Sequence, residues 1–160
     1  MIRYRDATAD DLGAICRLGQ EVNAAHQAAW PDVFAPPGDT ESQEALWRQG
    51  IRVPDATTFV AERDGQVIGF VSVFVANDKN ALLLPVTTAR LGSVGVAKAH
   101  RGQGIGTELM RRAEEWAASK GAIRITLNVW AFNERAVELY RELGYEIRSH
   151  AMGKRLLAQS

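Results

Sequence analysis

The feature that most constrains this chain is a glycine-rich loop, Gly102-Gln103-Gly104-Ile105-Gly106, between a predicted strand and a predicted helix. Without Cβ atoms such a loop can curl tightly and turn its N–H groups towards an anion. The start of the following helix adds unpaired N–H donors and the positive end of a helix dipole. One glycine would suffice for a simple turn, so this loop predicts a cradle for a phosphate or pyrophosphate.

The spacing of the glycines disagrees with two common phosphate-binding folds. A dinucleotide-binding fold that used Gly102 and Gly104 would need another glycine at position 107, where Thr107 stands. A P-loop ends in Gly-Lys-Ser or Gly-Lys-Thr, and no lysine follows Gly106. A nucleotide-binding module that prefers NAD or ATP is therefore disfavoured.

Strands and helices alternate along the chain around this loop. Asp64-Gly65 between two apolar runs is a strong hairpin signal. Thr8 or Asp10 can cap a first helix, and Leu46 and Trp47 are expected to face inward from a second. The predicted strands cover 2–5, 57–63, 66–75, 89–96, 123–129, 145–148 and 151–155; the predicted helices run from the first cap through 22, over 40–50, from 106 to about 120 and over 133–143; 30–38 and 78–88 are predicted loops. This order predicts an α/β fold, a central mixed sheet flanked by about four helices, in one domain over residues 1–160.

Composition argues against several other classes of protein. Lys plus Arg equals Asp plus Glu at 19 each, so no bulk charge points to a nucleic acid or a membrane surface. No apolar run could span a membrane and the N-terminus lacks a signal-peptide core, which predicts a cytoplasmic protein. Cys16 is the single cysteine, so we expect a small buried side chain and neither a disulfide nor a cysteine zinc site.

Two blocks of sequence together indicate a family. Arg101, Gly104 and Gly106 form the pattern Arg-x-x-Gly-x-Gly. The second block comprises Leu127-Asn128-Val129, Asn133, Ala136, Leu139-Tyr140 and Leu143-Gly144-Tyr145. Both blocks make the chain resemble the GCN5-related N-acetyltransferases over nearly its whole length. The first block is similar to the pyrophosphate loop of that family, and the second to the segment that closes its pantetheine channel.

The resemblance implies transfer of an acetyl group from acetyl-coenzyme A to a primary amine, with no metal. Main-chain groups of a strand would pair with the amides of pantetheine, as in strand addition. The implied cofactor-binding residues are Val94, Gly95, Val96, Arg101, Gly102, Gln103, Gly104, Ile105, Gly106, Thr107 and Asn133. The valine side chains also suit a core, Arg101 could instead pair with an acidic neighbour, and Asn133 could simply cap a helix.

The resemblance also implies catalytic roles. Tyr140 matches the usual proton donor to the departing coenzyme A thiolate, although it could simply be a tyrosine packed within its own helix. Asn128 stands where some relatives carry a glutamate base; an amide cannot accept the proton but could hold a water. Glu21 and His26 are the other candidates for the base. The N–H of Val96 is the expected donor to the thioester carbonyl.

The acceptor is an amine whose class the sequence leaves open. His26, Trp30 and Phe34 are expected to line its pocket, and peptide N-termini, amino acids, polyamines and antibiotic amines are all candidates. A catalytically silent domain that binds acyl-coenzyme A as a sensor is the main alternative to an enzyme. Relatives that dimerise through late strands suggest a possible homodimer through residues 145–155.

Overall fold

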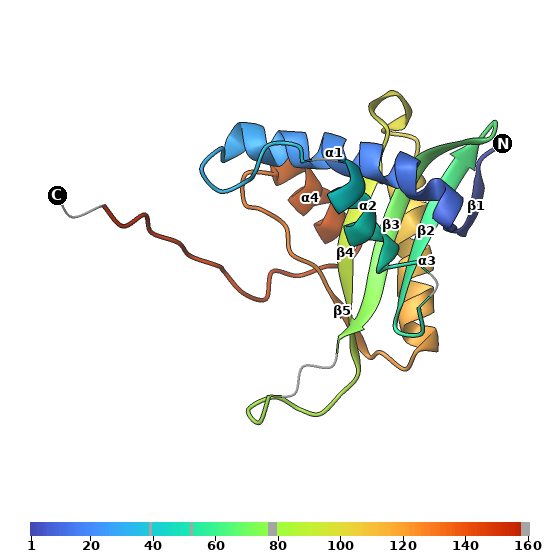
Figure 1. Ribbon diagram of the computed structural model, residues 1–160. Helices are drawn as coiled ribbons and strands as arrows, with labels where there is room; N and C mark the ends of the chain where they lie inside the picture. The colour runs from blue at the N-terminus through green and yellow to red at the C-terminus, as the bar shows by residue number, and fades with distance from the viewer. Residues whose placement is uncertain (39, 52, 77–79, 158–160) are drawn as a thin grey trace. The chain divides into compact units, whose positions relative to one another are not determined.

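The computed structural model describes residues 1–38, 40–51, 53–76 and 80–157 (Figure 1). The chain divides into two compact units, Met1–Asn128 and Val129–Ser160, and each is described by itself. Of the helices in the described segments, none is both long enough and apolar enough to cross a membrane.

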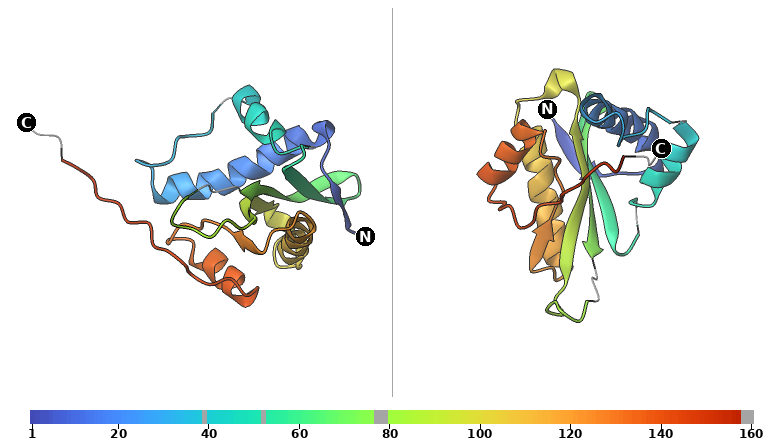
Figure 2. Two further views of the ribbon diagram at one scale, coloured as in Figure 1. Left: turned by 90° about the horizontal axis from the view of Figure 1, so that it is seen from below. Right: turned by 90° about the vertical axis from the view of Figure 1, so that its left-hand side faces the viewer.

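The first unit is built on a sheet of five strands in the order β1-β2-β3-β4-β5 among its described residues. The first four strands pair antiparallel and β5 pairs parallel to β4. The strands are β1 Arg3–Asp6, β2 Ala56–Arg63, β3 Gln66–Ala76, β4 Thr88–Val96 and β5 Arg124–Thr126; the helices are α1 Leu12–Ala29, α2 Thr40–Arg48 and α3 Ile105–Ser119, with 3-10 turns η1 at Ala9–Asp11 and η2 at Lys98–His100. Figure 2 shows α1 and α2 on one face of the sheet and α3 on the other.

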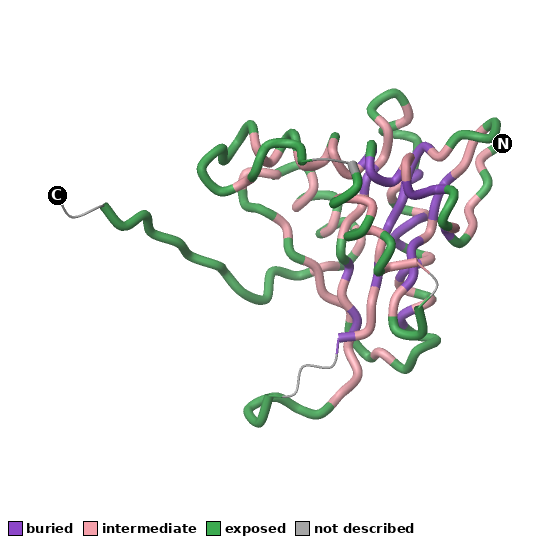
Figure 3. The backbone as a smooth tube through the Cα atoms, in the orientation of Figure 1, coloured by how far each residue is buried: buried purple, intermediate pink, exposed green. Residues whose placement is uncertain are grey.

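The core of this unit lies between the sheet and these helices, where Figure 3 shows the buried backbone. Its largest fully buried side chains are Phe70, Ile15, Ile105, Leu109, Met110, Val60, Val71, Val73 and Cys16. The burial predicted for Cys16 is confirmed. Gly69 lets α3 approach β3 closely, since a Cβ there would lie 3.2 Å from side-chain atoms of both Ile105 and Leu109.

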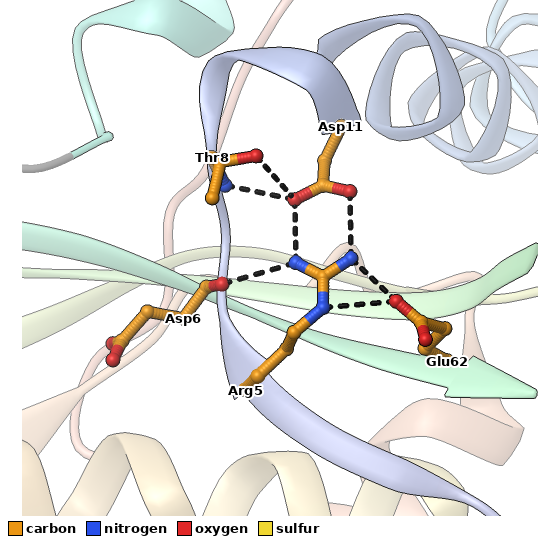
Figure 4. Close-up of polar contacts among 5 residues, drawn as sticks. All are labelled: Arg5, Asp6, Thr8, Asp11 and Glu62. Carbon is orange, nitrogen blue, oxygen red and sulfur yellow. Dashed lines mark hydrogen bonds and ion pairs between the residues drawn. The ribbon is translucent and has the colours of Figure 1, made fainter. Parts of the chain in front are cut away.

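A charged cluster fastens the edge strand β1 (Figure 4). The Arg5 guanidinium donates to both carboxylate oxygens of Asp11 at 2.7 and 2.9 Å, and to Glu62 on β2 at 2.6 and 2.9 Å. Asp11 also accepts from the Thr8 N–H at 2.8 Å. Hydrogen bonds from Arg5 hold the pKa of the Asp11 carboxyl below its ordinary value, against the effect of burial. The cluster therefore ties β1, the start of α1 and β2 together.

The second unit contains α4, Glu134–Glu142. Asn133 caps it by accepting the Ala136 N–H at 3.3 Å, and Gly144 follows its end with a positive φ of 94°. The strands predicted over 145–148 and 151–155 are wrong: residues 146–157 are exposed and have no ladder partner, without which a strand does not form. The homodimer contact expected of the same segment stays a prediction.

The α/β class with a mixed sheet flanked by helices is confirmed. Asp64 and Gly65 form the predicted hairpin turn, with φ of 50° and 77°. Residues 80–87 are irregular as predicted, while 77–79, including Asp78 of that predicted loop, lie outside the described residues. α1 continues past the predicted apolar stripe to Ala29, directly before the predicted irregular stretch. The strand predicted over 123–129 was too long: β5 is limited to Arg124–Thr126, because its pairing with β4 ends there.

The expectation that Leu46 and Trp47 both face inward from α2 was wrong for one of them. Leu46 is 60% exposed, whereas Trp47 packs its ring on Phe70 at 5.2 Å between centroids. Adjacent positions on a helix point in different directions, so the partly buried Trp47 can face the sheet while Leu46 faces away from it.

Replacing Asp11 by Asn should lower the free energy of unfolding by about 2–4 kcal/mol at neutral pH, because the Arg5 charge loses its bidentate partner. A carboxyl whose folded pKa is depressed stabilises the fold above its unfolded pKa, ordinarily 3.8, and this is lost as pH falls through the folded value. Urea unfolding at a series of pH values should therefore show the difference between wild type and Asp11→Asn shrinking below pH 3.8. A difference that stays constant there would contradict the assignment.

Candidate active site

One edge of β4 is open next to the glycine loop. β4 pairs with β5 only over Thr88–Arg90, so within the described residues the ladder on this edge stops there. Ala97, just after β4, donates its N–H to Ile68 at 2.8 Å on the β3 side. Alternate residues of a strand use opposite edges, so Val96 and, two residues before it, Val94 turn their N–H and C=O groups to the open edge. This edge can accept a peptide-like ligand.

The glycine loop continues directly from this edge. Gly102 and Gly104 have left-handed φ values of 76° and 77°, and a Cβ at either would meet nothing within 4 Å. Glycine is therefore required there by backbone conformation rather than by packing. Gly104 caps α3, whose first-turn N–H groups have no partner within the helix. A Cβ on Gly106 would lie 3.8 Å from the Val96 side chain, so the loop adjoins the end of β4.

The other predicted loop residues contribute differently. Ile105 is 1% exposed and its side chain belongs to the core, so only its backbone can serve a ligand. Gln103 and Thr107 are exposed beside it. The loop therefore offers main-chain donors with a polar surround, which suits a pyrophosphate.

Arg101 joins the loop to β4 and α1. Its Nε donates to the Val96 carbonyl at 2.9 Å, and its Nη2 lies 3.9 Å from the Glu21 carboxylate on α1. Arg101 thus has an acidic neighbour, and its role at the cosubstrate stays a prediction. Both side chains of the ion pair are about half exposed, so the pair contributes only ~0–1 kcal/mol and Arg101 can exchange Glu21 for another anion at little cost.

Gly95 has a packing reason that sequence reasoning missed. A Cβ there would lie 2.8 Å from Cε1 of Phe70 and 3.2 Å from Cγ2 of Val22 on α1. Only glycine lets α1 and Phe70 close on this part of β4. The two valines that flank it keep their backbone groups at the open edge.

Another missed feature is a β-bulge in β4. The register passes from Val73↔Leu91 to Val71↔Val94, so Ser72 faces both Gly92 and Ser93. The one local signal is Gly-Ser within an otherwise apolar strand.

The acceptor candidates lie at the C-terminal end of α1. His26 and Phe34 stack with ring centroids 5.1 Å apart and an interplanar angle of 25°. The chain after α1 folds back on it, because Phe34 donates its N–H to Trp30 at 3.0 Å and Asn23 donates to the Ala35 carbonyl at 3.4 Å. The structure thus brings His26 and Phe34 together, while Trp30 is 47% exposed. Burial lowers the pKa of His26, against a backbone hydrogen bond with Val22.

The predicted catalytic residues fall in different units. Asn128 is exposed and is the last residue of the first unit. Asn133 and Tyr140 belong to the second unit, where Asn133 is the helix cap described above. The Tyr140 ring contacts Tyr145 edge-on at 5.9 Å, and burial raises the pKa of its phenol. Tyr140 therefore holds its proton throughout the neutral range.

Comparison with known proteins gives a consistent result. The model of the acetyltransferase (GNAT) family matches residues 20–145. Streptothricin acetyltransferase of Streptomyces lavendulae is 36% identical over 92 residues, covering 57% of this chain and 45% of the relative. The uncharacterized N-acetyltransferase YdgE of Bacillus subtilis (strain 168) is 38% identical over 74 residues, covering 46% and 47%. The chain thus spans about half the length of these curated relatives.

Solved structures share the fold over nearly the whole chain. A mutant of the BH1408 protein from Bacillus halodurans superimposes with a TM-score of 0.87 at 21% identity, covering 97% of this chain and 99% of that one. The aminoglycoside N-acetyltransferase AAC(6')-Iy, in complex with CoA, gives a TM-score of 0.76 at 17% identity, covering 98% and 95%. Identities this low show a common fold.

Replacing Phe34 by Ala should raise the pKa of His26 towards its ordinary value of 6.5, because removing the stacked ring rehydrates the imidazole. An NMR titration of the His26 ring protons measures this directly. Val33→Ala is the matched control, since Val33 is an exposed neighbour in the same segment and should leave the titration unchanged. Equal titrations in wild type and Phe34→Ala would show that the stack does not desolvate His26.

Proposed function

The chain belongs to the acetyltransferase (GNAT) family, and we propose that it transfers an acetyl group from acetyl-coenzyme A to a primary amine. The observation that carries the proposal is the open edge of β4 leading directly into the left-handed glycine loop. Relatives named as acetyltransferases and a neighbour of the same fold described in complex with CoA support it.

The described residues fit the cosubstrate. The amides of pantetheine can pair with the main-chain groups of Val94 and Val96, as a short added strand would. The N–H groups of Gly102 to Thr107 suit the pyrophosphate, which the N-terminus of α3 further stabilises. Arg101 can add a positive charge by leaving Glu21. The main-chain groups of Gly95 face β3, so we propose that Gly95 serves the cosubstrate only by holding the two valines beside it in place. Asn133 is proposed as a further contact, although capping already explains its place.

In the proposed reaction the amine nitrogen attacks the thioester carbonyl carbon and the C–S bond breaks. The Val96 N–H would stabilise the oxygen that gains negative charge. The phenol of Tyr140 would give its proton to the departing thiolate, and its raised pKa keeps that proton available. The nitrogen gives up its proton to a water held by Asn128, to Glu21 or to His26. The lowered pKa of His26 favours the neutral imidazole that a base requires.

We propose that His26, Trp30 and Phe34 form the wall that the amine acceptor meets. A streptothricin acetyltransferase and an aminoglycoside acetyltransferase among the similar proteins make antibiotic amines one class to test, beside polyamines, amino acids and peptide N-termini. We further propose that residues 1–160 act as one domain in the cytoplasm, without metal or nucleic acid.

A catalytically silent acyl-coenzyme A sensor is the second candidate, favoured by Asn128 where a glutamate base would stand. The two functions separate in one assay. An enzyme releases free coenzyme A thiol from acetyl-coenzyme A when an amine is added, whereas a sensor shows a rise in melting temperature with acetyl-coenzyme A but no release with any amine.

Tyr140→Phe should lower kcat for thiol release roughly 10²-fold and leave KM for acetyl-coenzyme A nearly unchanged, because only the departing thiolate needs the proton. In wild type the rate should not fall on the alkaline side until above pH 10, since burial raises the phenol pKa beyond its ordinary 10.0. Tyr145→Phe, which removes the hydroxyl from the neighbouring ring, is the control and should keep full activity. Full activity in Tyr140→Phe would remove Tyr140 from the mechanism.

Gly104→Ala should weaken coenzyme A binding, whereas Gly121→Ala should not. Both glycines have left-handed φ, 77° and 82°, with open space around them, so each substitution costs a similar ~1–2 kcal/mol of backbone strain. Only Gly104 lies at the N-terminus of α3, in the proposed cradle; Gly121 follows the other end. Melting temperatures should fall alike in the two variants. Calorimetric titration that finds equal affinities for coenzyme A would contradict the cradle.

A further inference from the structure

The β4 bulge decides which main-chain groups reach the open edge. Val75 of β3 donates its N–H to an acceptor 2.8 Å away on the β2 side, so the main-chain groups of the next residue, Phe74, face β4. Phe74 is the partner of Arg90, and the main-chain groups of Arg90 therefore face β3. In an unbroken ladder every second position after Arg90, up to Val96, would also face β3. The extra residue of the bulge shifts this count by one. The main-chain N–H and C=O groups of Val94 and Val96 therefore face the open edge instead of β3.

A side chain on the neighbouring strand holds the bulge. A bulge leaves one ladder group without its regular partner, and here the Ser93 N–H donates to the Ser72 hydroxyl oxygen at 2.9 Å. Ser72 keeps its regular pairing with Thr58 on the opposite side of β3, so its position is fixed by β2. The hydroxyl thus replaces a missing backbone carbonyl.

Gly92 provides the room for that hydroxyl. A Cβ on Gly92 would lie 2.6 Å from the Ser72 Oγ, closer than real Cβ atoms approach, whereas the next atoms, Cβ of Ser72 and Cε1 of Phe74, are at 3.7 and 3.8 Å. The φ of Gly92 is not among the positive ones. Of the atoms nearest to Gly92, only the Ser72 hydroxyl oxygen, in the position that bonds Ser93, is too close for a Cβ.

We propose that Ser72 is a positioning residue for acetyl-coenzyme A binding, acting with Gly92 to lock the bulge that presents the Val94 and Val96 amides. This inference rests on the proposed function. Loss of the hydroxyl leaves the Ser93 N–H unpaired and frees β4 to shift towards the regular ladder, in which the two valine amides turn away from the cosubstrate.

Coenzyme A binding to the full chain, measured by calorimetry, tests the proposal. Ser72→Ala should bind roughly tenfold more weakly, about the effect of one lost hydrogen bond. Ser72→Thr keeps the hydroxyl and should restore most of the affinity. Ser119→Ala removes a hydroxyl at the far end of α3 and should bind as wild type does. Each variant is first shown to be folded at the temperature of the titration, so lost stability alone does not change the affinity.

Amide hydrogen exchange provides a readout that needs no ligand. The Ser93 amide should exchange at least about tenfold faster in Ser72→Ala than in wild type, because it has lost its acceptor. Unchanged protection of Ser93 would show that the hydroxyl does not hold the bulge and would overturn the proposal. Wild-type affinity in Ser72→Ala would do the same. A wild-type protein that binds no coenzyme A would instead overturn the proposed function, and the role of Ser72 in binding with it.

The pair Ser72 and Gly92 allows a second, independent test. Gly92→Ala should lower the melting temperature and weaken binding, because its Cβ displaces the Ser72 hydroxyl. Adding Ser72→Ala to it removes the clash, so the double variant should melt at a higher temperature than Gly92→Ala. It should still bind coenzyme A weakly, because the hydroxyl is absent. A double variant with wild-type affinity would overturn the proposal even if Ser72→Ala alone failed to fold.

Discussion

Among the residues that the structure describes, β4 has a partner strand on both sides over Thr88–Arg90 and on one side only beyond Arg90. The rest of the site depends on this separation of β4 from β5. Main-chain groups inside a sheet satisfy one another, and a row of open groups next to the core is available only where a ladder stops. Because of the bulge, the main-chain groups of Val94 and Val96 face this open edge. The turn η2 then connects β4 to the glycine loop. Main-chain groups of the strand edge and N–H donors at the helix N-terminus thus follow one another closely along the chain.

Helices and side chains pack closely on both faces of the sheet at the end of β4. Gly95 lets Phe70 and α1 press on β4 from one side, and Gly69 lets α3 approach from the other. Further away, the Arg5 cluster fixes β1 to β2 and to the start of α1, so the helix that covers β4 is anchored at its N-terminal end. At the C-terminal end of the same helix, the rings of His26 and Phe34 stack on each other. The end of β4 is therefore packed on both of its faces, while its edge stays open.

The sequence allowed accurate prediction of features that depend on a few consecutive residues. The Asp64-Gly65 hairpin, the Asn133 cap and the glycine loop follow from local backbone preferences, and the family resemblance then identified the fold. Features that depend on a distant partner were missed. The bulge needs Ser72 on the neighbouring strand, and the exposure of Leu46 depends on which side of α2 meets the sheet. An acidic neighbour of Arg101 was expected as an alternative, but its identity, Glu21 on α1, could not be predicted. The wrong late strands have the same cause, because alternating residues form a strand only beside a partner.

The most direct test of the open-edge account is an NMR titration of the backbone amides with coenzyme A. The largest shifts should occur at the amides of Val94, Val96 and the loop from Gly102 to Thr107. The amides of β1 and β2, which β3 separates from β4 in the sheet, should shift little. Large shifts confined to other parts of the chain, with the end of β4 and the loop unaffected, would contradict it.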